Sequence, residues 1–136
     1  MPSRTTFLSR LTGLYLILIA LAMLAHKQAA VETMNTLVRH PPVLFVLGVI
    51  AVAAGLAMVL SHNVWSGGVL AVVVTLYGWL LLTKGVLLLF LSPGAVYGLL
   101  LAGIHFERFF HLYTAIALVL GICLSYGGFR SAARRA

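Results

Sequence analysis

VLAVVVTLYGWLLLTKGVLLLFL, residues Val69–Leu91, is an unbroken apolar stretch that carries a single charge, Lys84. A helix crosses the hydrocarbon layer of a bilayer with about 20 residues, within a range of about 17–25. Three further apolar stretches reach this length on either side of it. The sequence therefore predicts an all-α, four-helix transmembrane bundle that forms a single integral membrane domain over residues 1–136, with spans at about 7–25, 43–60, 69–91 and 109–126.

The overall composition supports a membrane protein and argues against a soluble one. The chain is 62% hydrophobic and 8% charged, whereas a typical soluble domain is about 25% charged. The net charge of +7 forms no basic stripe, so no nucleic-acid partner is expected, and the partner is the lipid bilayer. The single cysteine, Cys123, excludes an intrachain disulfide and is expected to be a small packing residue.

The positions of lysine and arginine predict the orientation of the chain. Four spans place both termini on one side, and the terminal segments carry five arginines: Arg4, Arg10, Arg130, Arg134 and Arg135. The opposite side receives Lys27, Arg39 and Arg108. Because cytoplasmic segments carry the excess of basic residues, we expect a multi-pass protein of the bacterial inner (plasma) membrane with both termini cytoplasmic. A signal peptide cleaved near Ala20-Leu21-Ala22 is the alternative for the first span, and it would leave the orientation of the others unchanged.

The region Ala95–Tyr126 is too long for one straight span, because at 1.5 Å per residue it would extend about 48 Å. Ser92-Pro93-Gly94 breaks the helix before it. We therefore expect a short interfacial helix over about 95–107 on the outer side, then a bend near His105–Arg108, then the last span. On the same side, the helical spacing of Val31, Met34 and Val38 predicts a second short surface helix between Lys27 and His40.

Small residues recur at a spacing of seven in every span. Seven residues are two helical turns, so each pair marks one face on which a neighbouring backbone can approach closely. This pattern predicts tight helix packing, either within the chain or in a homo-oligomer or larger membrane complex. The pairs are Gly13 with Ala20, Gly48 with Gly55, Gly78 with Gly85, and Gly121 with Gly128.

Lys84 is the polar residue in the most unusual place, about 10 Å inside the third span by helical rise. A lysine held at depth costs about 2.5–3.5 kcal/mol on insertion scales unless it reaches the interface or finds a partner. Glu107 is the expected partner, and Glu107 and His111, four residues apart, would share one helical face. Lys84, Glu107 and His111 therefore form a candidate intramembrane polar site.

The histidines suggest a weaker alternative. His26, His40 and Glu32 are expected on the same outer side as His111, so a metal site, or a haem held by His26 and His111, is an alternative. The spacings match no known metal motif. No metal and no cofactor is therefore predicted, and a metal- or quinone-linked membrane redox component stays an alternative.

The turn between the second and third spans supplies a second candidate site. His62 and Asn63 can satisfy free carbonyl groups at a helix end, and Trp65 suits the headgroup layer. The pattern His62-Asn63-x-Trp65, Thr75-x-x-Gly78-Trp79 and Lys84-Gly85 resembles one found in small, uncharacterised bacterial inner-membrane proteins with four spans. The resemblance covers the central hairpin. It implies a shared architecture and a candidate turn or interface site of His62, Asn63, Trp65 and Trp79, without naming an activity.

These features favour a non-catalytic subunit or accessory protein that acts through helix packing. An enzyme is not predicted, because the sequence supplies no nucleophile–base pair, phosphate loop or cofactor motif. An oligomeric small transporter or channel, using Lys84 with Glu107 and His111, is the main alternative.

Overall fold

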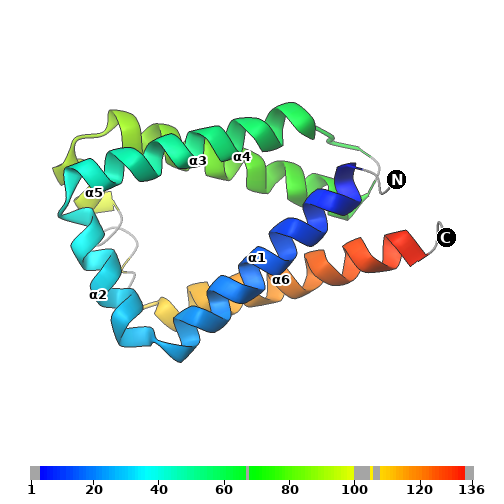
Figure 1. Ribbon diagram of the computed structural model, residues 1–136, viewed down its shortest axis with the longest axis horizontal. Coiled ribbons are helices and arrows are strands. Elements are labelled where there is room, and N and C mark those ends of the chain that lie inside the picture. The colour runs from blue at the N-terminus through cyan, green and yellow to red at the C-terminus, as the bar shows by residue number, and fades with distance from the viewer. Residues whose placement is uncertain (1–3, 67, 100–104, 106–107, 134–136) are drawn as a thin grey trace.

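The computed structural model describes residues 4–66, 68–99, 105 and 108–133, and this part of the chain forms helices joined by short connections (Figure 1). In chain order the helices are α1 (Arg4–Ala25), α2 (Lys27–Val38), α3 (Pro41–Ser61), α4 (Val69–Phe90), α5 (Pro93–Tyr97) and α6 (Phe110–Ala133). The fold is the expected all-α, four-helix transmembrane bundle.

The four long helices associate as two antiparallel pairs. α1 packs along α6, which comes from the other end of the sequence, and α3 packs along α4. The pairs lie closest near the chain termini and spread apart toward α2, which bridges the end of α1 and the start of α3 (Figure 1). We call α1 with α6 the terminal pair, and α3 with α4 the central pair.

Each of the four long helices contains a window that is long and apolar enough to cross a membrane. Between 17% and 28% of the residues in these windows are buried inside the protein, so most of their apolar surface faces outward. A water-soluble protein does not leave such continuous apolar faces uncovered. The four spans are therefore those of a multi-pass membrane protein.

Glycines form the contact surface of the central pair, as the seven-residue spacing predicted. A methyl group added at Gly55 would lie 2.5 Å from the backbone nitrogen of Leu82. One added at Gly85 would lie 2.6 Å from the backbone nitrogen of Val52. The two backbones can approach this closely only because the glycines have no side chain.

The terminal pair uses the same device together with polar side chains. A methyl group at Gly13 would lie 2.6 Å from the backbone nitrogen of Ser125. The buried Ser9 hydroxyl donates a hydrogen bond to the carbonyl of Leu124 at 2.8 Å. In a lipid environment, hydrogen bonds between helices add to close packing, which supplies the association that water would otherwise drive.

The last helix extends beyond the apolar stretch from which its span was predicted. The predicted span covers about 109–126, and α6 runs from Phe110 to Ala133. Arg10 of α1 lies alongside this extension, where its Nε donates to the carbonyl of Gly128 at 3.2 Å and its guanidinium lies 4.4 Å from the ring centre of Phe129. These tertiary contacts offset the poor helix propensity of glycine.

The connecting helices at the other end are confirmed in part. α2 occupies the expected surface position, and Pro41 and Pro42 open α3, where a missing N–H has no cost. Of the predicted interfacial segment 95–107, α5 covers only the start, beginning at Pro93, and residues 100–104 and 106–107 lie outside the described residues. The bend before α6 is present at His105, whose φ is 49°.

Candidate functional site

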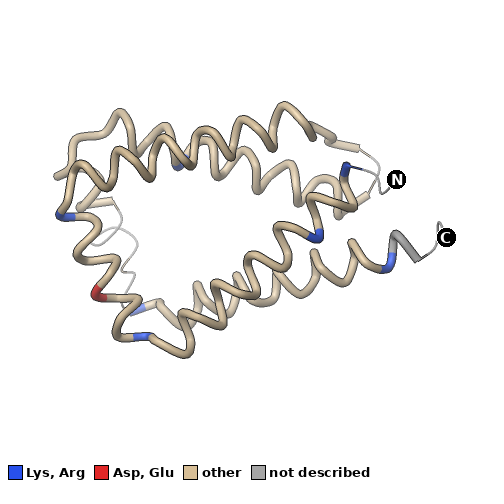
Figure 2. Tube along the Cα trace, in the orientation of Figure 1, with Lys and Arg blue, Asp and Glu red and all other residues tan. Residues whose placement is uncertain are grey.

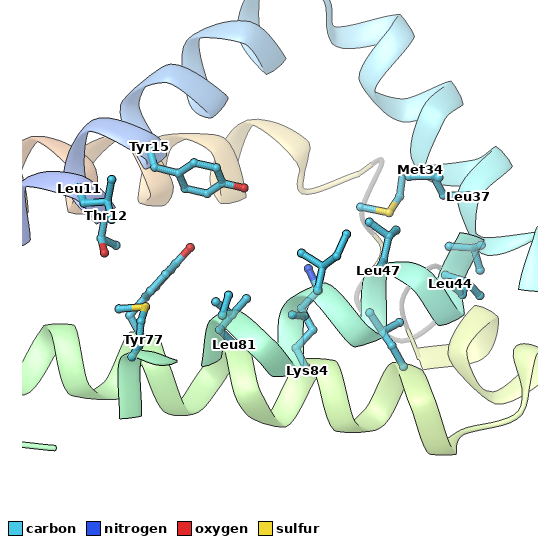
Figure 3. A pocket seen from close by; sticks show the side chains of 16 residues that line it. Leu11, Thr12, Tyr15, Met34, Leu37, Leu44, Leu47, Tyr77, Leu81 and Lys84 are labelled. Atoms are coloured by element: carbon cyan, nitrogen blue, oxygen red, sulfur yellow. The ribbon is translucent and has the colours of Figure 1, made fainter. Parts of the chain in front are cut away.

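A cavity of about 620 Å³ separates the central pair from α1 and α2 (Figure 3). α1 contributes Leu11, Thr12 and Tyr15 to its wall, and α2 contributes Met34, Leu37 and Val38. α3 adds mostly aliphatic side chains between Leu44 and Met58. Most of the wall is therefore apolar and comes from inside the membrane layer.

One face of α4 provides the remainder of the wall. Tyr77, Leu81, Lys84 and Leu88 all line the cavity, and their spacing of four, three and four residues places them in one stripe along the helix. Gly78 and Gly85 follow Tyr77 and Lys84 directly, about 100° further round, and face α3. A spacing of seven residues therefore recurs both in the face of α4 that packs on α3 and in the face that lines the cavity.

Lys84 is the only charged residue among the described residues that line the cavity. Its side chain rises from α4, and the ammonium nitrogen points into the cavity (Figure 3). It has no hydrogen-bond or ion-pair partner in the part of the chain that the structure describes. Its expected partner, Glu107, lies outside the described residues. Lys84, an exposed residue, therefore has no described partner for its charge in this wall, about 9 Å from the end of α4.

Hydroxyl groups accompany this charge. Tyr15 from α1 and Tyr77 from α4 both point into the cavity, from opposite walls (Figure 3). Thr12, one turn before Tyr15, is 5% exposed and also lines the cavity. Sequence reasoning missed these residues, although Tyr77 lies seven positions before Lys84, the spacing that was used to pair glycines.

His111 belongs to a different environment. Its Nε2 lies 3.2 Å from Nζ of Lys27, at the junction of α2 with the start of α6. Because an ammonium group only donates hydrogen bonds, Nε2 is the acceptor in this contact. Lys27 also lies 5.7 Å from the ring centre of Phe110. His111 does not line the cavity, so it does not join Lys84 in one site.

The predicted turn site is organised around Thr75. The Thr75 hydroxyl, on a side chain that is 1% exposed, accepts a hydrogen bond from the Val64 N–H at 3.2 Å. Its own proton can be donated to the carbonyl of Val64 or to that of Ala71, each 3.0 Å away. This residue ties the turn after α3 to the first turns of α4.

The other turn residues surround this contact. Nε1 of Trp79 donates to Oδ1 of Asn63 at 3.5 Å, which is a long hydrogen bond. His62 is 4% exposed, and its Nε2 has no hydrogen-bond partner among the described residues. Trp65 is exposed, as a residue at the headgroup layer would be. The structure therefore brings His62, Asn63 and Trp79 to one place.

The turn and the cavity are separate. Lys84 is nine residues beyond Thr75, about 14 Å along the helix. Most residues of the pattern in the central hairpin have a structural use, since Thr75 holds the turn and Gly78 and Gly85 face α3. Lys84 makes no such contact with the described residues, and this makes it the strongest functional candidate of the set.

Among the described residues, no three His, Cys, Asp or Glu side chains lie close enough together to hold a metal ion. His26 directly precedes α2, and His40 lies two residues beyond its end.

Comparison of the chain with protein-family models, with curated proteins and with solved structures finds no match. A function must therefore be argued from the geometry of the cavity and of the two helix pairs.

Proposed function

We propose that this protein is a non-catalytic accessory component of a membrane that holds an apolar, lipid-class molecule between its two helix pairs. The observation that carries the proposal is the cavity of about 620 Å³ between α1, α2, α3 and α4. Ligand sites usually measure about 300–1,000 Å³ and combine an apolar wall with a few polar groups. The wall described above has this composition.

The location of the cavity supports the same proposal. Its wall comes largely from the membrane-spanning helices, so a molecule dissolved in the bilayer can reach it without passing through water. An apolar chain gains little from leaving lipid for an equally apolar wall. Specific binding therefore depends on shape and on the few polar groups.

The glycine faces of the four spans already have partners within the chain. The glycine faces that predicted packing against a partner are covered by the chain's own helices, as Gly13 and Gly55 illustrate. A homo-oligomer or larger complex, which we also propose, would have to use the outward apolar faces. Exposed side chains such as Leu18 and Leu80 supply these faces.

We further propose the bacterial inner membrane as the location, with both termini in the cytoplasm. Figure 2 shows basic residues at the two ends of the helix pairs and one lysine part-way along α4. Arg4, Arg10 and Arg130 lie toward the end that carries the termini, and the described part of the α3–α4 turn adds no charge to it. The basic groups at this end favour the cytoplasmic side.

Transport through an oligomer has less support. That alternative placed Lys84, Glu107 and His111 on one polar path. Of the two members that the structure describes, Lys84 lines the cavity, whereas His111 contacts Lys27 outside it.

A substitution that fills the cavity tests the proposed function. Ala54 lines the cavity, whereas Ala57, one turn further along α3, does not, and both are exposed small residues on that helix. We expect Ala54→Trp to reduce crosslinking of a photoactivatable hexadecanol by about tenfold, because the indole occupies the space of the ligand. Mass spectrometry of the labelled peptides measures the effect on the purified, full-length protein.

Ala57→Trp is the matched control and should leave the labelling of the α4 cavity stripe unchanged. Equal labelling of both variants and the wild type would mean that the probe coats the outer surface. That result would contradict a binding function for the cavity.

A further inference from the structure

We infer that the cavity selects a single-chain amphiphile with an acidic head group, a carboxylate or a phosphate, which pairs with Lys84. This inference rests on the proposed function and adds the class of ligand. It starts from the unpaired charge. Lys84 is directed into the cavity and lacks a polar partner among the described residues (Figure 3).

The described cavity wall contains no carboxylate that could neutralise this ammonium group. The acidic residue of α2, Glu32, is exposed and is not part of the cavity wall. The residues of α2 that do line the cavity are Met34, Leu37 and Val38. An ammonium group in an apolar space is stabilised by an opposite charge that accepts its hydrogen bonds. An anion brought by the ligand meets that need.

The hydroxyl groups suit the same ligand. Tyr77 lies two turns from Lys84 in the same stripe, and Tyr15 faces it from α1 (Figure 3). Phenol groups donate hydrogen bonds, so the cavity offers an acidic head group further donors besides Lys84. The aliphatic side chains of α3 and α4 that line the cavity, such as Leu44 and Leu88, would contact the hydrocarbon chain.

The volume of the cavity matches a ligand with one chain. At about 30 Å³ for each water-sized group, a cavity of about 620 Å³ takes on the order of 20 non-hydrogen atoms. A long-chain fatty acid or alkyl phosphate has about this size. A single-chain amphiphile is therefore the ligand that we expect the site to hold.

Three probes of the same chain length test the inference: palmitate, hexadecyl phosphate and uncharged hexadecanol. Each is titrated into the purified, full-length protein in an uncharged detergent, and native mass spectrometry measures the fraction of protein that carries it. We expect one of the acidic probes or both to bind about ten- to a hundredfold more tightly than hexadecanol, as expected for a hydrogen bond between charged groups. The stronger acidic probe identifies the head group.

Lys84→Met should abolish this preference and leave hexadecanol binding unchanged, which also reports that the variant is folded. Lys84→Arg should retain most of the preference, and Lys27→Met, which removes a lysine outside the cavity, should retain all of it. Equal binding of charged and uncharged probes to the wild type would overturn the head-group inference and leave the proposed function standing. Failure of all three probes to bind would overturn both.

Discussion

At the residue scale, Thr75 shows how one hydroxyl group can organise a connection between two spans. Its oxygen accepts from the N–H of Val64, and its side chain is almost fully buried at the start of α4. The sequence pattern around the turn pointed to His62 and Asn63 as the chemically interesting residues. The structure places a threonine almost two helix turns into the next span at the centre of the turn's hydrogen bonds, because only folding brings it under the turn.

Replacing Thr75 by valine removes this acceptor while keeping the shape of the side chain. We expect Thr75→Val to lower the free energy of unfolding by about 1–2 kcal/mol, since the Val64 N–H loses its partner in a partly buried place. Titration with a denaturing detergent, followed by circular dichroism, measures the change. Thr83→Val, at an exposed position of the same helix, should change stability by less than about 0.5 kcal/mol, and a similar loss in both variants would contradict the role of the turn.

At the element scale, α6 illustrates how contacts between helices decide where a helix ends. Two consecutive glycines, Gly127 and Gly128, are poor helix formers and lie in the last turns of this helix. The helix nevertheless continues to Ala133, with Arg10 of α1 bonded to the Gly128 carbonyl and lying over Phe129. The helix propensity of single residues has little effect on where a helix ends when a neighbouring helix supplies a charged hydrogen-bond donor.

Arg10→Ala should therefore loosen the end of α6. We expect backbone amides of residues 127–133 to exchange with deuterium about tenfold faster, because the lost hydrogen bond and ring contact together contribute on the order of 1–2 kcal/mol. Hydrogen-exchange mass spectrometry of the protein in micelles measures this. Arg4→Ala, at the exposed start of α1, is the control, and uniform acceleration along the whole of α6 would point to general destabilisation instead.

At the scale of the whole molecule, two helix pairs that diverge from one end create the cavity. Each pair is closed by its own glycine seam, while the pairs meet one another mainly near the chain termini. α2 keeps their other ends apart and contributes Met34 and Val38 to the wall. The space for a ligand is thus a property of how the pairs are joined, and no single span contains it.

The arrangement of spans predicts a pattern of chemical access. In a Cys123→Ser background, Gln28→Cys on α2 should react with a membrane-impermeant maleimide in intact spheroplasts, and Ser66→Cys in the α3–α4 turn should react only after permeabilisation. Both are exposed residues at opposite ends of the helix pairs. Labelling followed by gel-shift detection reads out the result.

The native Cys123 provides an internal control in the wild-type chain. It is exposed on α6 within a membrane-spanning window, so lipid should protect it until detergent is added. Reversed labelling of the two engineered cysteines would reverse the orientation. Labelling of Cys123 in intact spheroplasts would contradict the assignment of α6 as a span.

The number of spans, their approximate bounds and the surface helix between Lys27 and His40 follow from the sequence alone, because span length, hydropathy and proline positions are local properties. The seven-residue glycine faces were equally visible. Which helix packs against which could not be predicted, because all four spans carry the same pattern and any two of them could have packed together. The fold alone decides that α1 packs on α6 and α3 on α4.

The same reasoning applies to the candidate site. Lys84 stood out in the sequence because a charge within an apolar span is costly wherever it points. Its neighbours could not be inferred, because Tyr15 and Met34 reach the same cavity from helices that are far from α4 in the sequence. Sequence thus determined which residues enter the membrane, and tertiary structure decided which of them face one another, since helices in lipid choose partners by the fit of their surfaces and not by hydrophobicity.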